Sequence, residues 1–80
     1  MDYDKDKLDE AVFALLYLGL HDCDAFGGRA WKGMDWDALD RLHAKGLISD
    51  PRSKAKSVVL GTDAIAAAEK AFVKLFGKAG

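Results

Sequence analysis

The most constraining feature of the sequence is the stretch 35–76, in which helix signals stand on both sides of a strand pattern. Asp35 can cap the free amides of a first helical turn, directly before an apolar stripe at helical spacing. This stripe consists of Trp36, Leu39 and Leu42. Gly46 follows as the expected left-handed stop. These signals predict a helix over about 36–45.

A strand pattern and a second helix pattern follow this stop. We predict one strand at about 47–49 and an antiparallel partner at about 56–60, where apolar residues alternate. Pro51 has no amide hydrogen and marks the turn between them. Apolar residues recur at helical spacing over 63–76, which predicts the closing helix.

With a first helix over about 5–20, this order of elements is that of a winged-helix unit. We therefore predict an α+β, mostly α fold for one domain over 1–80: a winged-helix-like three-helix domain with a small antiparallel β-hairpin. The segment 29–32 is the candidate for a third short strand. A complete winged helix normally has two helices between its first helix and its hairpin, whereas this chain has room there for one clear helix, at 36–45.

The first helix has two apolar stripes. One consists of Leu8, Val12, Leu15 and Leu16, and the other of Phe13, Tyr17 and Leu20. A helix that is apolar nearly all round is normally buried on more than one side, and 80 residues offer little chain to cover both. We expect the second stripe, with Phe72 and Phe76 of the last helix, to form a homodimer contact. The alternative is that the small domain itself wraps this helix tightly.

Composition indicates a globular chain, because half of the residues are apolar and the net charge is −1. The single cysteine, Cys23, cannot form an internal disulfide, which fits a reducing compartment. The acidic start lacks the basic region of a secretion signal, and the apolar run at 11–20 is too short to span a membrane. We therefore expect a cytoplasmic protein without a membrane partner.

The charge is unevenly distributed along the chain. Residues 1–28 hold seven acids against two bases, whereas residues 29–60 hold seven bases against four acids. A DNA-binding alternative would use the helix 36–45 and the wing 52–56. Its candidate residues are Arg41, Lys45, Arg52, Lys54 and Lys56. Against it, three acids lie near the start of that helix, and the domain lacks a strongly basic footprint.

His21, Asp22, Cys23 and Asp24 are four potential metal ligands in a row. Consecutive residues rarely converge on one ion, and zinc sites favour paired spacings. Cys23 with a histidine would also need an orienting group and a pocket to act as a nucleophile, and the neighbouring sequence supplies neither. We therefore predict no metal, no cofactor and no enzyme activity.

Trp31 is the candidate contact for a ligand or partner. It lies beside Lys32, and aromatic residues next to bases can stack on nucleotides. On a strand its side chain would point either into the core or outward.

Three segments carry a family resemblance: LDEAVFALLYLGLHD, RAWKGMDWDALDRLHAKGLI and KAKSVVLGTDAI. They resemble a family of small bacterial proteins catalogued only as a domain of unknown function. The resemblance covers most of the chain and implies a small winged-helix-like domain with no established activity. More distantly, the glycine stop, the basic turn and the strand before the last helix resemble the wing of bacterial transcription regulators.

The sequence thus predicts a non-enzymatic binding module, most simply a homodimeric protein-interaction or assembly domain. Its partner would be a second copy or another protein. The alternative is a DNA-binding transcriptional regulator, because bases on one helix and one turn suit phosphate contacts.

Overall fold

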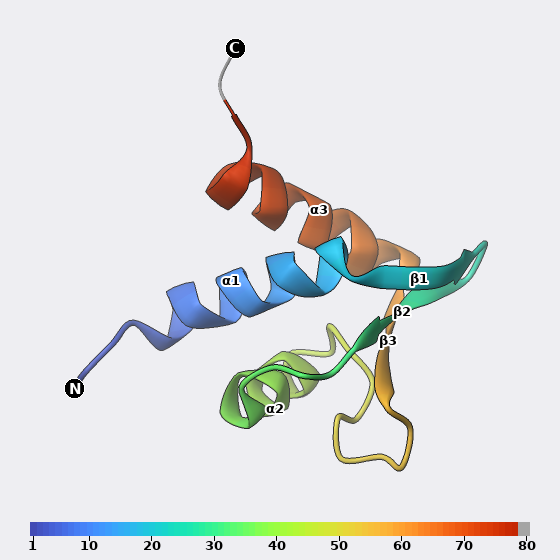
Figure 1. The fold of residues 1–80 in the computed structure, drawn as a ribbon, viewed down its shortest axis with the longest axis horizontal. Helices are drawn as coiled ribbons and strands as arrows, with labels where there is room; N and C mark the ends of the chain where they lie inside the picture. Colours follow the sequence, from blue (N-terminus) through green and yellow to red (C-terminus); the bar gives the residue numbers. More distant parts are fainter. Residues whose placement is uncertain (79–80) are drawn as a thin grey trace.

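The computed structural model describes residues 1–78, so the last two residues of the domain predicted over 1–80 lie outside the described part. Within residues 1–78 the chain forms three helices and a three-stranded sheet (Figure 1). In chain order the elements are α1 (Lys5–Leu18), β1 (Leu20–Asp24), β2 (Gly27–Trp31), α2 (Trp36–Ala44), β3 (Ser57–Gly61) and α3 (Thr62–Phe76). The prediction of an α+β, mostly α fold is confirmed.

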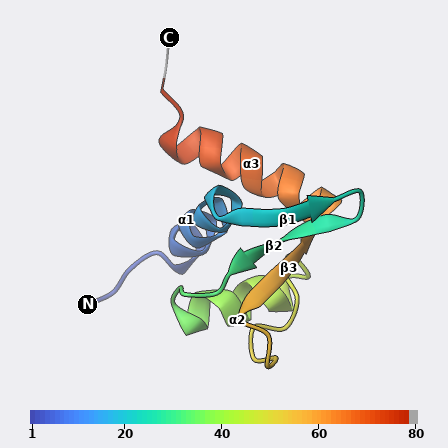
Figure 2. The same ribbon diagram turned by 45° about the vertical axis from the view of Figure 1, so that its right-hand side comes forward.

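The sheet is antiparallel with the order β1-β2-β3, and its two faces differ. One face carries Ala30, Val58 and Leu60, all fully buried in the core with side chains of the helices. α1 lies between α3 and α2 (Figures 1 and 2). The opposite face carries the exposed Arg29 and Trp31 and is called the outer face below.

The predicted strand at 47–49 is wrong. The amide of Leu47 is already engaged by the end of α2, where it donates to the carbonyl of Leu42 at 3.1 Å. Only Ser49 reaches β3, and its amide donates to the carbonyl of Val59 at 3.0 Å. Pro51 follows two residues later and cannot extend a ladder. The hairpin that motivated the winged-helix prediction therefore does not form, and the winged-helix part is not confirmed.

The main partner of β3 is β2, so the candidate third strand at 29–32 is confirmed as a strand at 27–31. β1 was missed, because Gly27 and Gly28 were interpreted as breaks. In the structure they let strands approach closely. Gly27 has φ 146°, and an added Cβ would lie 2.2 Å from the Leu60 carbonyl oxygen. The first helix consequently ends at Leu18 and not at residue 20.

The predicted helix limits of α2 and α3 are confirmed within one residue. The Asp35 carboxylate accepts from the Ala38 amide at 3.0 Å, as an N-cap does. Gly46 has φ 76°, and its amide donates to the His43 carbonyl at 2.9 Å, which completes a Schellman ending. Trp36 is the exception in the apolar stripe, since its side chain is half-exposed.

Candidate interaction surfaces

A buried carboxylate lies where α1 meets α2. The side chain of Asp9 is 2% exposed, and both of its oxygens accept from the Arg41 Nε–H at 2.8–2.9 Å. The Lys45 ammonium lies 3.7 Å away. The hydrogen bond to Asp9 raises the pKa of the Arg41 guanidinium, so this guanidinium stays charged. The sequence held a signal for this cluster that was overlooked: Asp9 is an acid on the buried stripe of α1.

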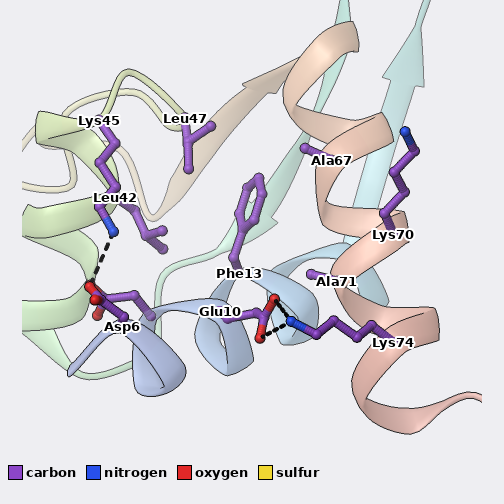
Figure 3. A pocket seen from close by; sticks show the side chains of 11 residues that line it. Asp6, Glu10, Phe13, Leu42, Lys45, Leu47, Ala67, Lys70, Ala71 and Lys74 are labelled. Carbon is purple, nitrogen blue, oxygen red and sulfur yellow. Dashed lines mark hydrogen bonds and ion pairs between the residues drawn. The ribbon is translucent and has the colours of Figure 1, made fainter. Parts of the chain in front are cut away.

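A cavity of about 330 Å³ opens between α1, α2 and α3 beside this cluster (Figure 3). Phe13 points into it from α1, between Leu42 and Leu47 on one side and the alanines of α3 on the other (Figure 3). On its rim Glu10 pairs with Lys74 at 3.1 Å. An apolar floor with paired charges at the rim suits the packing of an apolar side chain.

Three of the five bases predicted for DNA contact form ion pairs within the chain. Arg41 and Lys45 are held by Asp9, as described above. Arg52 pairs with Asp40 at 2.7 Å, and its hydrogen bond lowers the pKa of that carboxyl. Their charge is therefore partly neutralised before any phosphate arrives.

The other two bases, Lys54 and Lys56, are exposed on the segment between Pro51 and β3. Lys32 holds this segment, because its ammonium donates to the carbonyls of Pro51 and Ser53, both at 2.7 Å. Among residues 1–78, the five predicted bases thus fall into two groups: three form ion pairs and two do not.

Of the residues predicted for the dimer contact, Phe13 is placed in the core. Its side chain is only 5% exposed, which leaves little surface for a partner. Tyr17 and Leu20 pack against the core and are half-buried. The small domain therefore wraps much of its first helix itself, which was the alternative stated above.

An aromatic ladder nevertheless leads from this core to the surface. It consists of Tyr17, Phe72 and Phe76. The ring centroids of Tyr17 and Phe72 are 5.8 Å apart, and those of Phe72 and Phe76 are 5.4 Å apart. Phe76, on the last turn of α3, is 49% exposed, and its neighbours Val73 and Leu75 are also exposed.

Trp31 lies on the outer face of the sheet and is 59% exposed. Its ring stacks on the imidazole of His21, with centroids 4.9 Å apart and planes 22° apart. A hollow of about 390 Å³ lies beside the two rings, and Arg29 and Lys56 contribute to its lining. Trp31, the predicted ligand contact, thus has one aromatic neighbour, His21, and two basic neighbours, Arg29 and Lys56.

The four consecutive candidate ligands from His21 to Asp24 all lie on β1. Within residues 1–78, no group of three or more histidine, cysteine or acidic side chains could hold a metal ion. Cys23 is exposed as a free thiol. In the same part of the chain, no helix has the length and apolar character needed to cross a membrane.

Comparisons with known proteins identify relatives along almost the whole chain. A family model described as "Domain of unknown function (DUF6429)" matches residues 4–78. The chain is 49% identical over 76 residues to an uncharacterised protein named y4hR of the bacterium Sinorhizobium fredii. This match covers 95% of the chain and 97% of that relative. No solved structure matches the chain.

Proposed function

The chain belongs to the DUF6429 family of domains of unknown function, and on this premise we propose that it is a homodimeric interaction module and not an enzyme. The observation that carries the proposal is the aromatic ladder of Tyr17, Phe72 and Phe76, which ends at the surface. We infer that a second copy packs against the last turn of α3.

The exposed end of the ladder supports this proposal through its apolar character. Val73, Leu75 and Phe76 follow one another within four residues and all retain large exposed fractions. Single exposed apolar residues are ordinary, but the rings of Phe72 and Tyr17 connect the exposed Phe76 to the core, and such a connected apolar surface favours an interaction. Aromatic side chains contribute large contact areas there at low entropic cost.

Charge favours association in a defined orientation. Asp6 of α1 and Lys70 of α3 are exposed and belong to none of the ion pairs among residues 1–78, whereas Glu10 and Lys74 are already paired with each other. In a two-fold dimer each copy presents both signs, so acids of one copy can meet lysines of the other.

The DNA-binding alternative has less support than the dimer. Arg41 and Arg52 both form ion pairs at 2.7–2.8 Å, which leaves less charge for phosphates. We also propose a cytoplasmic location, which the lone free thiol of Cys23 supports, because disulfides are rare in reducing compartments.

Sedimentation over a range of concentrations tests the dimer. We expect the measured mass to rise from that of the 8.7 kDa monomer to twice this value as concentration increases. A monomer mass at every concentration would overturn the proposal.

A pair of phenylalanine variants tests the surface. Phe76→Asp places a charge at the end of the ladder and should weaken dimerisation at least about tenfold, because hot-spot aromatics cost 2 kcal/mol or more when removed. Phe26→Asp makes the same change at an exposed phenylalanine of the β1–β2 turn and should leave the dissociation constant unchanged. Equal effects of the two variants would contradict the assignment of this surface.

A further inference from the structure

We propose that the outer face of the sheet binds single-stranded nucleic acid, with one base stacked on Trp31 and the backbone phosphates beside Arg29 and Lys56. This site uses none of the residues of the aromatic ladder. It also differs from the DNA-binding alternative, which relies on α2 and would address a duplex. The proposed nucleic-acid site is therefore independent of the proposed dimer contact.

The first support is a preorganised aromatic platform. The residue Trp31 is 59% exposed although His21 already stacks against its ring. The His21 Nδ1 lies 3.2 Å from the carbonyl oxygen of Gly19, which fixes the imidazole, since Nδ1–H donates to that oxygen. A ring that is held in place loses little conformational entropy when a base stacks on it. Stacking on aromatic side chains is how proteins bind unpaired bases without strong sequence preference.

The second support is a pair of free cations beside the platform. Among residues 1–78, neither Arg29 nor Lys56 belongs to any of the ion pairs, in contrast to Arg41 and Arg52. Arg29 is on β2, two residues from Trp31, and both residues point to the outer face. Lys56 directly precedes β3, whose Ser57 pairs with Trp31. Two unneutralised bases thus flank the aromatic platform, where a phosphate bound to a stacked base would lie.

The third support is the extent of the site, which favours a strand over a free nucleotide. A second hollow of about 190 Å³ adjoins the first, and the two share Asp22, Arg29 and Val59 in their linings. Trp31 lines the first hollow and Phe26, which is 88% exposed, lines the second. Two adjoining hollows, each with an exposed aromatic ring, match two successive nucleotides of one strand.

Two acids line this surface: Asp24, whose carboxylate already accepts from the Phe26 amide at 2.8 Å, lines the second hollow, and Asp22 lines both. A carboxylate accepts hydrogen bonds and repels phosphate, so we infer that the Asp22 side chain accepts a hydrogen bond from the amino group of a base. The bases of a duplex are stacked on one another and offer no free face to Trp31, which is why we infer a single strand.

Fluorescence of Trp31 tests this proposal directly. Trp36→Phe leaves Trp31 as the only tryptophan of the chain, and α2 keeps an aromatic residue at that position. A short oligothymidylate added to this variant at low salt should quench the emission and saturate. Rising salt should weaken binding with a slope of about −0.7 per phosphate contact. The absence of any change in emission, together with no comigration of the oligonucleotide, would overturn the proposal.

Matched variants locate the site, and their binding is measured by anisotropy of a labelled oligonucleotide. Trp31→Ala should weaken binding by about 5- to 150-fold, the amount expected for one lost stacked base. Arg29→Gln and Lys56→Gln should each lower the affinity and reduce the salt slope by about 0.7. Lys54→Gln removes a base from the same segment that lines neither hollow, and it should change little. Equal losses for Lys54→Gln and Lys56→Gln would show only diffuse attraction and contradict the site.

Two other ligands complete the test. Thymidine monophosphate should bind much more weakly than the oligonucleotide, because it fills one hollow only. A duplex of the same length should compete poorly. Equal affinity for the mononucleotide or for the duplex would overturn the assignment to a single strand. Since the residues of the ladder are unchanged in all of these variants, sedimentation of the same samples reports on the dimer independently.

Discussion

Asp40 and Arg41 are neighbours on α2, yet their ion pairs lie in different surroundings. Arg41 reaches toward α1 and pairs with Asp9, whose side chain is almost fully buried. Asp40 reaches toward the segment after α2 and pairs with Arg52, whose side chain is largely exposed. Both pairs are equally short, so distance does not distinguish them. We therefore expect the burial of the partner to decide how much an ion pair contributes to the stability of the fold.

The largest effect should come from the buried member of the first pair. Asp9→Ala leaves the guanidinium of Arg41 without its acceptor at the α1–α2 junction. We expect the free energy of unfolding to fall by about 3 kcal/mol, the lower end for a broken buried pair, because Arg41 can turn partly to water. Urea unfolding measures the loss, and Tm should fall by about 10 °C or more. Asp6→Ala, at an exposed acid on the same helix, should cost less than about 1 kcal/mol. If the two variants are equally stable, the buried pair has no special role.

A double variant tests whether the charges of Asp9 and Arg41 are themselves needed for stability. The double change Asp9→Leu with Arg41→Met replaces the ion pair by apolar side chains of similar size. Such replacements are often neutral or stabilising, because neither charge must leave water. We expect the urea midpoint of the double variant to lie clearly above that of Asp9→Ala. A midpoint at or below that of Asp9→Ala would mean that the charges themselves hold α1 against α2.

The smallest effect should come from the exposed pair. Asp40→Asn should shift Tm by no more than about 2 °C at neutral pH, because water already screens this contact. Any contribution of the Asp40–Arg52 pair to thermal stability should also depend on pH. The hydrogen bond from Arg52 lowers the pKa of Asp40 below its ordinary value of 3.8, so the folded state favours the charged carboxylate. The contribution is therefore present above pH 3.8 and is lost as the pH falls below it. Thermal melts of both proteins from pH 7 to pH 2.5 should converge at the acid end; a difference that grows toward low pH would contradict this assignment.

The sequence predicted helices better than strands, and local interactions explain why. The cap of Asp35 and the stop at Gly46 act within five residues, so their signals are complete in a short window. The pairing of β3 depends on residues that are remote in sequence. The segment 47–49 looked like a strand, but the end of α2 had already engaged the Leu47 amide.

The candidate surfaces were predicted only in part. Trp31 was singled out from its neighbours in sequence, and the structure adds His21, which stacks on it from the adjacent strand. Phe13 was expected at a dimer contact, but it is in the core, because α2 and α3 of the same chain cover this side of α1; periodicity shows that the stripe is apolar but not what covers it. The burial of Asp9 depends in the same way on Arg41, which lies 32 residues further along the chain.

The sequence alone established where the three helices begin, where α2 and α3 end, the mostly α composition and the presence of an aromatic residue beside bases on a strand. Only the tertiary structure decided which strands pair, which bases are neutralised and which apolar residues remain on the surface. The two groups differ in the sequence separation of the interacting residues. Caps and helical periodicity act over one or two turns, whereas strand pairing, ion pairing and burial depend on elements that meet only after the chain has folded.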